Sequence, residues 1–398
     1  MHALQMLHQL LEKNCPDIHR RRLTVVITQI QALITGQTLT VTGLGRSRGG
    51  TIGMKHAIKA SDRLVGNRHL NKERRSIYQV ITGVLLHRIK RPLISIDWSD
   101  CTSDRSLLLL RAAVAVGGRS LTLHEEVHPY RYYGNSRIQK RFLNTLHTLV
   151  PSGCRPIIIT DAGFGGPWFR AVLQQGWDYV GRAGQHLLFR SSPEDEWIKC
   201  QTLHRQASAT PRYLGEVDLV RSRPFRCHLY LYHKPRRGRH KLTRYGQRAC
   251  SKHSRKNAQR EQAPWILVTS LNGRGFTAKQ VVQLYRTRMQ IEESFRDIKN
   301  QRTGFSLSET RSRSAERLAN LLLIGMLATF VVWLIGRLAE EKQLQYQYQA
   351  NTVKDQRVLS LFYLGCLLIR QGQLSFTQRE CHRAIKLIRH DMLTQWNW

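Results

Sequence analysis

Acidic residues are scarce in this sequence of 398 residues. It contains 27 Asp and Glu against 63 Lys and Arg, which gives a formal net charge of +36 at pH 7. An enzyme that does not bind polyanions is not expected to carry such an excess of positive charge. The charge predicts a nucleic-acid partner, bound largely through its phosphates. A basic membrane-surface protein is the alternative, but the charge is spread along the chain rather than gathered in a tail.

Paired cysteines and an apolar N-terminal run are also lacking. The eight cysteines include no C-x2-C pair, which predicts reduced thiols and a cytoplasmic protein. Polar residues interrupt any apolar run at the start, so no signal peptide is expected. Cys250 with His253, and Cys200 with His204, are candidate zinc pairs, but no second pair stands at zinc-finger spacing.

One long apolar run lacks charge altogether, Leu318–Gly336. It is flanked by Arg317 and Arg337 and is just long enough to span a bilayer. A membrane span would leave a strongly basic chain with a single late crossing. A helix buried on all sides in a large core has the same hydropathy. We therefore expect a core helix and no membrane contact.

Residues 1–85 carry a helical pattern of apolar residues. Within them, Thr38–Arg46 and Met54–Leu64 predict two short helices around a turn, the layout of a helix-turn-helix. Lys55, Lys59 and Arg63 lie on the second helix. We expect this region to bind DNA. A small helical domain with a solvated basic face is the alternative.

From Pro92 onward the pattern changes to strands and helices. The expected order is strand, strand, strand, helix, strand, helix, strand, over Leu93–Asp97, Leu107–Val116, Ser120–Val127, Ser136–Leu149, Pro156–Thr160, Trp168–Gln175 and Asp178–Gly181. Gly117-Gly118 connects the second strand to the third, as in a hairpin. This order predicts an α/β fold with a ribonuclease-H-like core, a mixed sheet with helices on its faces.

Two carboxylates follow apolar strands in that core. Asp97 ends the first strand, and Asp161 follows a later one. The ends of adjacent strands lie about 5 Å apart, so both side chains are expected to face one point. An ordinary turn residue is the alternative for either Asp alone. Asp100 and Asp104 are the local rivals of Asp97, but they lie past the predicted strand.

A third carboxylate lies in the stretch Tyr285–Lys299, YRTRMQIEESFRDIK. On one continuous helix its key polar residues share a narrow stripe: Tyr285, Arg288, Glu292 and Lys299. Glu293 and Asp297 are expected to point to solvent. A carboxylate flanked by cations and a tyrosine suits a metal-assisted reaction on phosphate. The alternative is an amphipathic helix with a salt-bridged face.

The rest of the chain predicts three further segments. Residues 183–272 form a β-rich insertion with a basic arm, Lys234–Arg260, which has eleven Lys and Arg and no acid. We expect the arm to bind DNA, with a merely solvating loop as the alternative. Residues 273–314 complete the catalytic core begun by residues 86–182, and residues 315–398 form a helical C-terminal region.

Several long stretches match a known family. They are IDWSD (Ile96–Asp100), RAAVAVGGRSLTL (Arg111–Leu123), TDAGF (Thr160–Phe164), RMQIEESFRDIK (Arg288–Lys299) and QANTV (Gln349–Val353). Together with the spacing Y-x2-R-x3-E-x6-K, they resemble the DDE transposases of the family-four insertion sequences, above all the transposon-ten branch. The resemblance runs through nearly the whole chain.

The resemblance implies an active site and a reaction. Asp97, Asp161 and Glu292 would hold two divalent cations, and all-oxygen ligands favour Mg2+ or Mn2+ over zinc. The implied steps are nicking at a transposon end, hairpin formation, hairpin opening and strand transfer into target DNA. The N-terminal domain would bind the transposon ends, and the protein would act as a homodimer in a synaptic complex.

The resemblance also implies DNA contacts. Tyr285, Arg288 and Lys299 would grip the phosphate backbone. Trp265 stands near the position of a tryptophan that stacks on a base flipped out of the transposon end, with a core aromatic as the alternative. Met289 stands where relatives carry another tryptophan and would cap the base with less stacking.

Two other functions remain open from the sequence. A ribonuclease-H-like nuclease would use the same carboxylates to cut DNA without joining it. A non-catalytic transposase derivative would only bind DNA, but the three carboxylates are all present.

Overall fold

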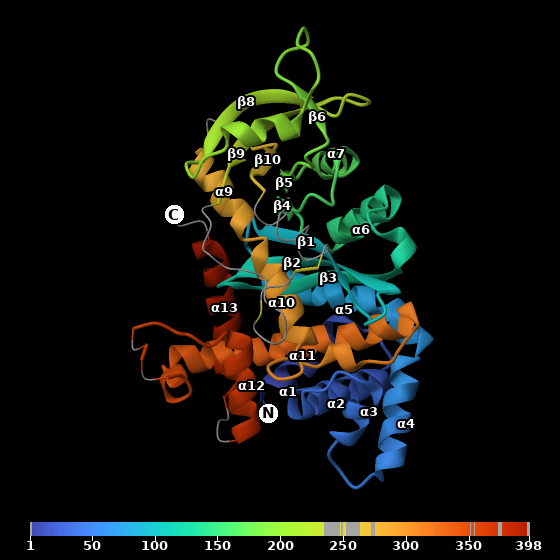
Figure 1. Cartoon of the computed structure of the whole chain (residues 1–398). Helices are drawn as coiled ribbons and strands as arrows, with labels where there is room; N and C mark the ends of the chain where they lie inside the picture. The colour runs from blue at the N-terminus through green and yellow to red at the C-terminus, as the bar shows by residue number, and fades with distance from the viewer. Residues whose placement is uncertain are drawn as a thin grey trace. The chain divides into compact units, whose positions relative to one another are not determined.

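The computed structural model describes residues 2–234, 247, 250–251, 263–271, 275–350, 352–353, 355–372 and 376–395. The chain divides into two units, whose elements are drawn in Figure 1. Unit 1 comprises Met1–Pro156 and Met289–Trp398, and unit 2 comprises Ile157–Arg288. The predicted basic arm, Lys234–Arg260, lies almost wholly outside the described residues.

Unit 1 begins with five helices: α1 (His2–Asn14), α2 (Arg20–Gly36), α3 (Val41–Arg46), α4 (Met54–Val65) and α5 (Arg68–Leu86). Polar side chains help to fix where they start. Thr40 Oγ1 accepts the Gly43 N–H at 2.9 Å before α3, and Asn67 Oδ1 accepts the Leu70 N–H at 3.0 Å before α5. Helices α3 and α4 are the two short helices that the sequence predicts, and their part in DNA binding stays a prediction.

Three antiparallel strands follow in unit 1: β1 (Leu93–Asp100), β2 (Leu107–Val116) and β3 (Arg119–Pro129). Their order is β3-β2-β1. Every residue of the central strand β2 is buried, which explains why all of them except Arg111 are apolar. Gly117 and Gly118 close the β2–β3 hairpin with φ values of +51° and +89°, a conformation that favours glycine. The predicted hairpin is confirmed.

The other elements of unit 1 are α6 (Ser136–Leu149), α10 (Met289–Lys299), α11 (Ala315–Glu341), α12 (Leu361–Gln371), α13 (Gln378–Thr394) and the 3-10 turns η1 (Tyr130–Tyr132), η3 (Leu307–Glu309) and η4 (Leu344–Gln347). The long helix α11 packs against β3 and against α2, α12 and α13 (Figure 1). It meets α12 closely, because a Cβ at Gly336 would lie 2.0 Å from the Leu361 carbonyl oxygen.

Helix α11 contains the long uncharged run of the sequence. Within the described part of the chain, it is the one helix long and apolar enough to cross a bilayer. Almost all of its apolar residues are buried inside the unit. The predicted core helix is therefore confirmed.

Unit 2 consists of β4 (Ile157–Thr160), α7 (Gly166–Gln174), β5 (Asp178–Arg182), β6 (Leu188–Arg190), β7 (Ile198–Lys199), η2 (Cys200–Gln206), β8 (Arg212–Leu219), β9 (Phe225–Tyr232), β10 (Trp265–Thr269) and α9 (Ala278–Arg286). Its strand order is β4-β5-β10-β9-β8-β6-β7. Strands β4 and β5 are parallel and are joined by α7, as a crossover requires. Strands β10, β9 and β8 continue antiparallel.

Strands and helices are mixed in both units, so the predicted α/β class is confirmed. Strands β6 to β9 fall in the segment predicted to be β-rich. The two units divide at Pro156 and Met289, which are not limits of the five predicted segments. That five-part division stays a prediction about function.

Candidate active site

Asp97 lies within β1 and not at its end. The strand continues to Asp100, because Asp97 pairs with Arg111 of β2 and Asp100 pairs with Leu108. The predicted end of this strand is therefore wrong, because pairing with the buried strand β2 continues past Asp97 to Asp100. Asp97 is 9% exposed, and its Oδ1 accepts the Trp98 N–H at 2.8 Å.

The stretch Tyr285–Lys299 is not one helix. Helix α9 ends at Arg286, and α10 begins at Met289. Between them, the Thr287 N–H bonds three residues back to the Leu284 carbonyl at 3.1 Å, and Thr287 Oγ1 donates to the same carbonyl at 2.6 Å. Such bonds compete with the helical ladder and tighten the last turn. The predicted single stripe on a continuous helix is therefore wrong.

Helix α10 nevertheless has the predicted apolar face, and it packs on the strands of unit 1. Its buried apolar residues are Ile291, Phe295 and Ile298. At its C-terminal end, Lys299 Nζ donates to Ser99 Oγ on β1 at 2.7 Å. Glu292 lies two helical turns before Lys299 and so on the same side of α10.

Lys299 lies in the electrostatic environment of Asp97. Burial lowers the pKa of Lys299, and Cys101, Asp100 and Asp97 oppose this shift, with the largest effect from Cys101 and the smallest from Asp97. The Lys299 ammonium also lies 5.5 Å from the centre of the Phe295 ring. Unit 1 therefore brings a candidate catalytic carboxylate and a candidate phosphate-binding cation to one strand.

Asp297 points into the protein, so its predicted exposure is wrong. Its Oδ2 accepts a hydrogen bond from Arg119 Nε at 3.0 Å. Burial raises the pKa of Asp297 to about 6, and the Arg119 guanidinium opposes this shift. The cause is the packing of α10 on β3, which carries Arg119. Glu293 is partly exposed and pairs with Arg296 at 2.7 Å.

Unit 2 gathers a second group of predicted residues. Tyr285 is buried at the end of α9, and its ring lies 4.9 Å from that of Trp265 at 73°. The Arg288 guanidinium lies 6.0 Å from the centre of the Tyr285 ring. Trp265 also contacts Tyr232, with ring centres 5.5 Å apart, and keeps part of its surface exposed. The three residues Trp265, Tyr285 and Arg288 therefore form one cluster.

Asp161 directly follows β4, as predicted. Its Oδ1 accepts the Gly163 N–H at 2.8 Å, the bond of an Asx turn. The residue is partly exposed. Each unit thus holds part of the predicted set: Asp97, Met289, Glu292 and Lys299 belong to unit 1, and Asp161, Trp265, Tyr285 and Arg288 belong to unit 2.

A comparison with protein families matches residues 91–331 to the Transposase DDE domain. This match covers more than half of the chain and includes the three acidic residues Asp97, Asp161 and Glu292. The chain belongs to the DDE transposase family. A comparison with curated proteins gave no match.

The acidic residues of this transposase fit a divalent cation by their chemistry. Carboxylate oxygens suit Mg2+ or Mn2+, and backbone N–H groups already orient two of the three carboxylates, those of Asp97 and Asp161. Among the described residues, no group of three or more His, Cys, Asp and Glu is gathered around one point as metal ligands. DDE transposases use divalent metals as a family.

The candidate zinc pairs of the transposase fit less well. Burial raises the pKa of the Cys200 thiol to about 12, whereas zinc binds the thiolate. The other pair includes His253, which lies outside the described residues.

A buried ion pair beside Asp97 was not predicted. Arg111 Nε and Nη2 lie 2.8 and 2.7 Å from Glu125 Oε2, and the Tyr78 hydroxyl donates to Glu125 Oε1 at 3.0 Å. Arg111 is 2% exposed and Glu125 is 1% exposed. The Arg111 guanidinium also lies 4.9 Å from the centre of the Phe295 ring of α10. The sequence does carry a signal, because Arg111 is the lone charge within an apolar strand.

Proposed function

We propose that this transposase cuts and joins DNA at the ends of an insertion sequence of the family-four group, most similar to the transposon-ten branch. The proposed steps are end nicking, hairpin formation, hairpin opening and strand transfer. The observation that carries the proposal is the hydrogen bond from Lys299 Nζ to Ser99 Oγ, two residues after Asp97 on β1, made from the helix that also bears Glu292. A carboxylate and a phosphate-binding cation at one place suit phosphoryl transfer.

Each residue has a proposed part in that chemistry. Asp97, Asp161 and Glu292 hold the divalent cations. Bound Mg2+ or Mn2+ supplies the Lewis acidity that an in-line displacement at phosphorus needs. Lys299 holds a phosphate oxygen next to Asp97, and its partly lost hydration strengthens that contact. The protein acts on transposon-end DNA and target DNA as a homodimer.

The proposed tyrosine and arginine contacts lie in unit 2. Arg288 offers a planar guanidinium that binds phosphate with two parallel hydrogen bonds. Tyr285 is buried against Trp265, so its part is to hold this cluster in place as well as to contact the backbone. Met289 is exposed, which leaves it available as the proposed apolar cap of a base.

The proposal is tested by incubating the purified protein with plasmids that carry candidate terminal repeats. We expect cleavage at the repeats with Mg2+ or Mn2+ and none after chelation. Cleavage that persists with excess EDTA would contradict the metal-dependent chemistry. Binding to the repeats without cleavage under any metal would favour the non-catalytic derivative.

Trp265→Ala is expected to keep first-strand nicking and to slow hairpin formation by about tenfold or more. A hairpin bends one strand sharply, and a flipped base that stacks on an aromatic ring relieves that strain, at roughly 1–3 kcal/mol per base. The measurement resolves nicked, hairpin and fully cut products on labelled end DNA. A normal hairpin rate in a folded variant would make Trp265 a packing residue only.

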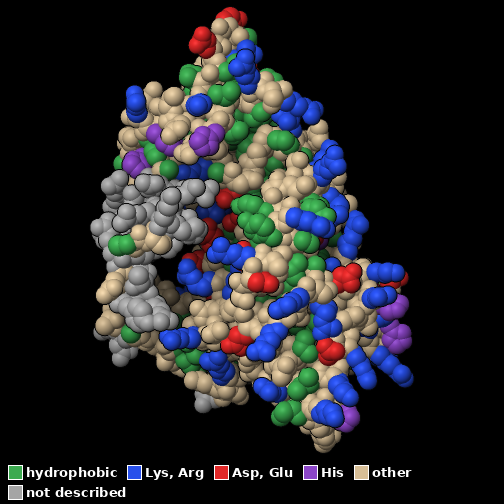
Figure 2. Space-filling model, turned by 45° about the vertical axis from the view of Figure 1, so that its right-hand side comes forward, with side chains coloured by type: hydrophobic (Ala, Val, Ile, Leu, Met, Phe, Trp, Pro, Cys, Tyr) green, Lys and Arg blue, Asp and Glu red, His purple; other side chains and the backbone are tan. Residues whose placement is uncertain are grey.

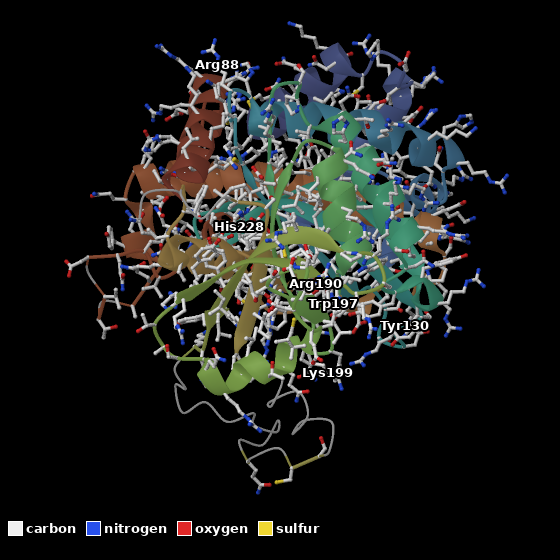
Figure 3. All side chains as sticks on the ribbon, turned by 90° about the horizontal axis from the view of Figure 1, so that it is seen from above. Arg88, Tyr130, Arg190, Trp197, Lys199 and His228 are labelled. Carbon is white, nitrogen blue, oxygen red and sulfur yellow. The ribbon has the colours of Figure 1, made fainter. Side chains whose placement is uncertain are left out.

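Trp197→Ala is the matched control for Trp265. Trp197 is also a partly exposed tryptophan of unit 2, and its ring lies 4.9 Å from the Arg190 guanidinium. Both side chains are labelled in Figure 3. We expect this variant to form hairpins at the normal rate.

End binding is expected to weaken steeply with salt. Lys and Arg side chains are spread over the face seen in Figure 2, with few Asp and Glu among them. If about six phosphates are contacted, the logarithm of the binding constant should fall with the logarithm of salt concentration with a slope of about −5. Fluorescence anisotropy on end DNA over a salt series measures it. A slope near zero would contradict binding through phosphates.

A further inference from the structure

A row of aromatic rings in unit 1 runs from the surface to the strand that carries Asp97. Tyr130 is 57% exposed and Tyr133 is 53% exposed. Their rings are almost parallel, at 8°, with centres 6.2 Å apart. The Tyr133 ring lies 5.9 Å from that of Trp98, the residue that directly follows Asp97 in β1 and whose backbone N–H donates to Asp97 Oδ1. Two large exposed rings are therefore connected by contacts to a candidate catalytic residue.

The segment that bears these rings is held at both ends. The Tyr130 N–H donates to the Ser106 carbonyl at 2.9 Å, which ties the start of η1 to the residue before β2. Asn135 Oδ1 accepts the Arg137 N–H at 3.0 Å and caps α6. Tyr130 is labelled in Figure 3 on the chain between β3 and α6. Rings on a backbone fixed in this way lose little conformational freedom when they bind a ligand.

The segment that bears the two rings is basic in sequence, and one neighbouring carboxylate, that of Asp104, accepts hydrogen bonds from Ser106. No Asp or Glu occurs between Val127 and Thr160. The Arg131 guanidinium lies 5.0 Å from the centre of the Tyr132 ring, and α6 adds three exposed cations: Arg137, Lys140 and Arg141. Arg141 is 3.6 Å from Glu126, whereas the other two form no salt bridge within the described part of the chain. The segment that bears the rings therefore also carries exposed cations suited to phosphate.

We propose that Tyr130 and Tyr133 form a stacking platform for unpaired bases of a DNA strand, with Arg131 and the α6 cations holding its phosphates. An exposed aromatic face accepts any base, whereas the bases of an intact duplex are hidden in the stack. The ligand is therefore a strand with unpaired bases. This inference rests on the proposed function only in taking DNA as the ligand, and it adds a site distinct from the cluster around Trp265.

The test uses the full chain with a fluorescein-labelled oligothymidylate of about 20 nucleotides, which is long enough to reach rings and cations together. Binding is measured by anisotropy. Tyr130→Ala/Tyr133→Ala is expected to bind about tenfold or more weakly, since two stacking contacts are lost. Tyr130→Phe/Tyr133→Phe keeps both rings and is expected to bind within about twofold of wild type.

Two further measurements separate stacking from other effects. Tyr346→Ala removes an exposed tyrosine of η4 and is expected to leave binding unchanged. The negative slope of log binding constant against log salt concentration should be the same for the double alanine variant and wild type, because no cation is removed. For Arg131→Ala/Arg137→Ala the slope should be shallower. Thermal unfolding of each variant checks that the loss is not a loss of folding.

The outcomes are distinct from those that test the proposed function. If wild type cuts terminal repeats but the double alanine variant binds the oligothymidylate as well as wild type does, the platform is wrong and the proposed function stands. Equal losses in the alanine and phenylalanine variants would also overturn it, since the rings would not be the binding groups. If wild type binds no DNA of any kind, both the platform and the proposed function are wrong.

Discussion

Asp97→Asn, Asp161→Asn and Glu292→Gln are each expected to lower end cleavage by about a thousand-fold or more. In the proposed mechanism each change removes a charged ligand of the divalent cations, and a loss of about 4 kcal/mol of transition-state stabilisation gives that factor. End binding should change by less than about threefold, because most of it comes from phosphate contacts made elsewhere. Cleavage and binding are measured on the same end DNA with Mg2+.

Asp100→Asn is the matched control for Asp97. Asp100 lies three residues further along β1 and pairs with Arg105 at 3.3 Å near the surface. Glu293→Gln serves in the same way for Glu292, since Glu293 is the next residue of α10 and pairs with Arg296. Both controls should cleave within a few-fold of wild type. A triad variant that cleaves as well as its control would remove that residue from the site.

Glu125→Ala is expected to lower the free energy of unfolding by about 3–5 kcal/mol. The change leaves the Arg111 guanidinium buried without its partner, and the cost of an uncompensated buried charge is of this size. The Tyr78 hydroxyl loses its acceptor as well. Urea unfolding followed by circular dichroism measures the difference. A loss below about 1 kcal/mol would mean that water reaches the guanidinium in the variant.

A double variant separates the charge from the packing at this position. Arg111→Met/Glu125→Leu removes both charges, and buried ion pairs can often be replaced by apolar residues at little cost. We expect it to be clearly more stable than Glu125→Ala. The exposed salt bridge between Asp100 and Arg105 provides a comparison. Asp100→Asn breaks it and should lower the free energy of unfolding by less than about 1 kcal/mol.

Much of the fold follows from local sequence patterns. The apolar run of β2 and the pair Gly117-Gly118 predict the hairpin, because the residues that make the turn are adjacent in the chain. Helix α6 is found where it is expected, since Asn135 caps its start. The uncharged run of α11 is buried, as expected of a core helix.

The remaining features depend on contacts that one segment does not specify. Asp97 lies in mid-strand because β2 pairs beyond it, and the sequence of β1 alone does not show this. Between α9 and α10, the N–H and the hydroxyl of Thr287 both bond to the Leu284 carbonyl, which the apolar periodicity does not show. Asp297 is buried because β3 places Arg119 against α10. For Asp97 and Asp297, tertiary packing overrides a local polar pattern.

Strand transfer tests the proposed function most directly. Pre-cut terminal-repeat DNA with a free 3′-OH is incubated with the protein, Mg2+ and a target plasmid, and joined products are resolved on a gel. We expect covalent joining by wild type and by Asp100→Asn, and none by Asp97→Asn or after chelation. Cutting of the plasmid without joining would identify a nuclease, and joining by Asp97→Asn would contradict the assignment of this residue to the active site.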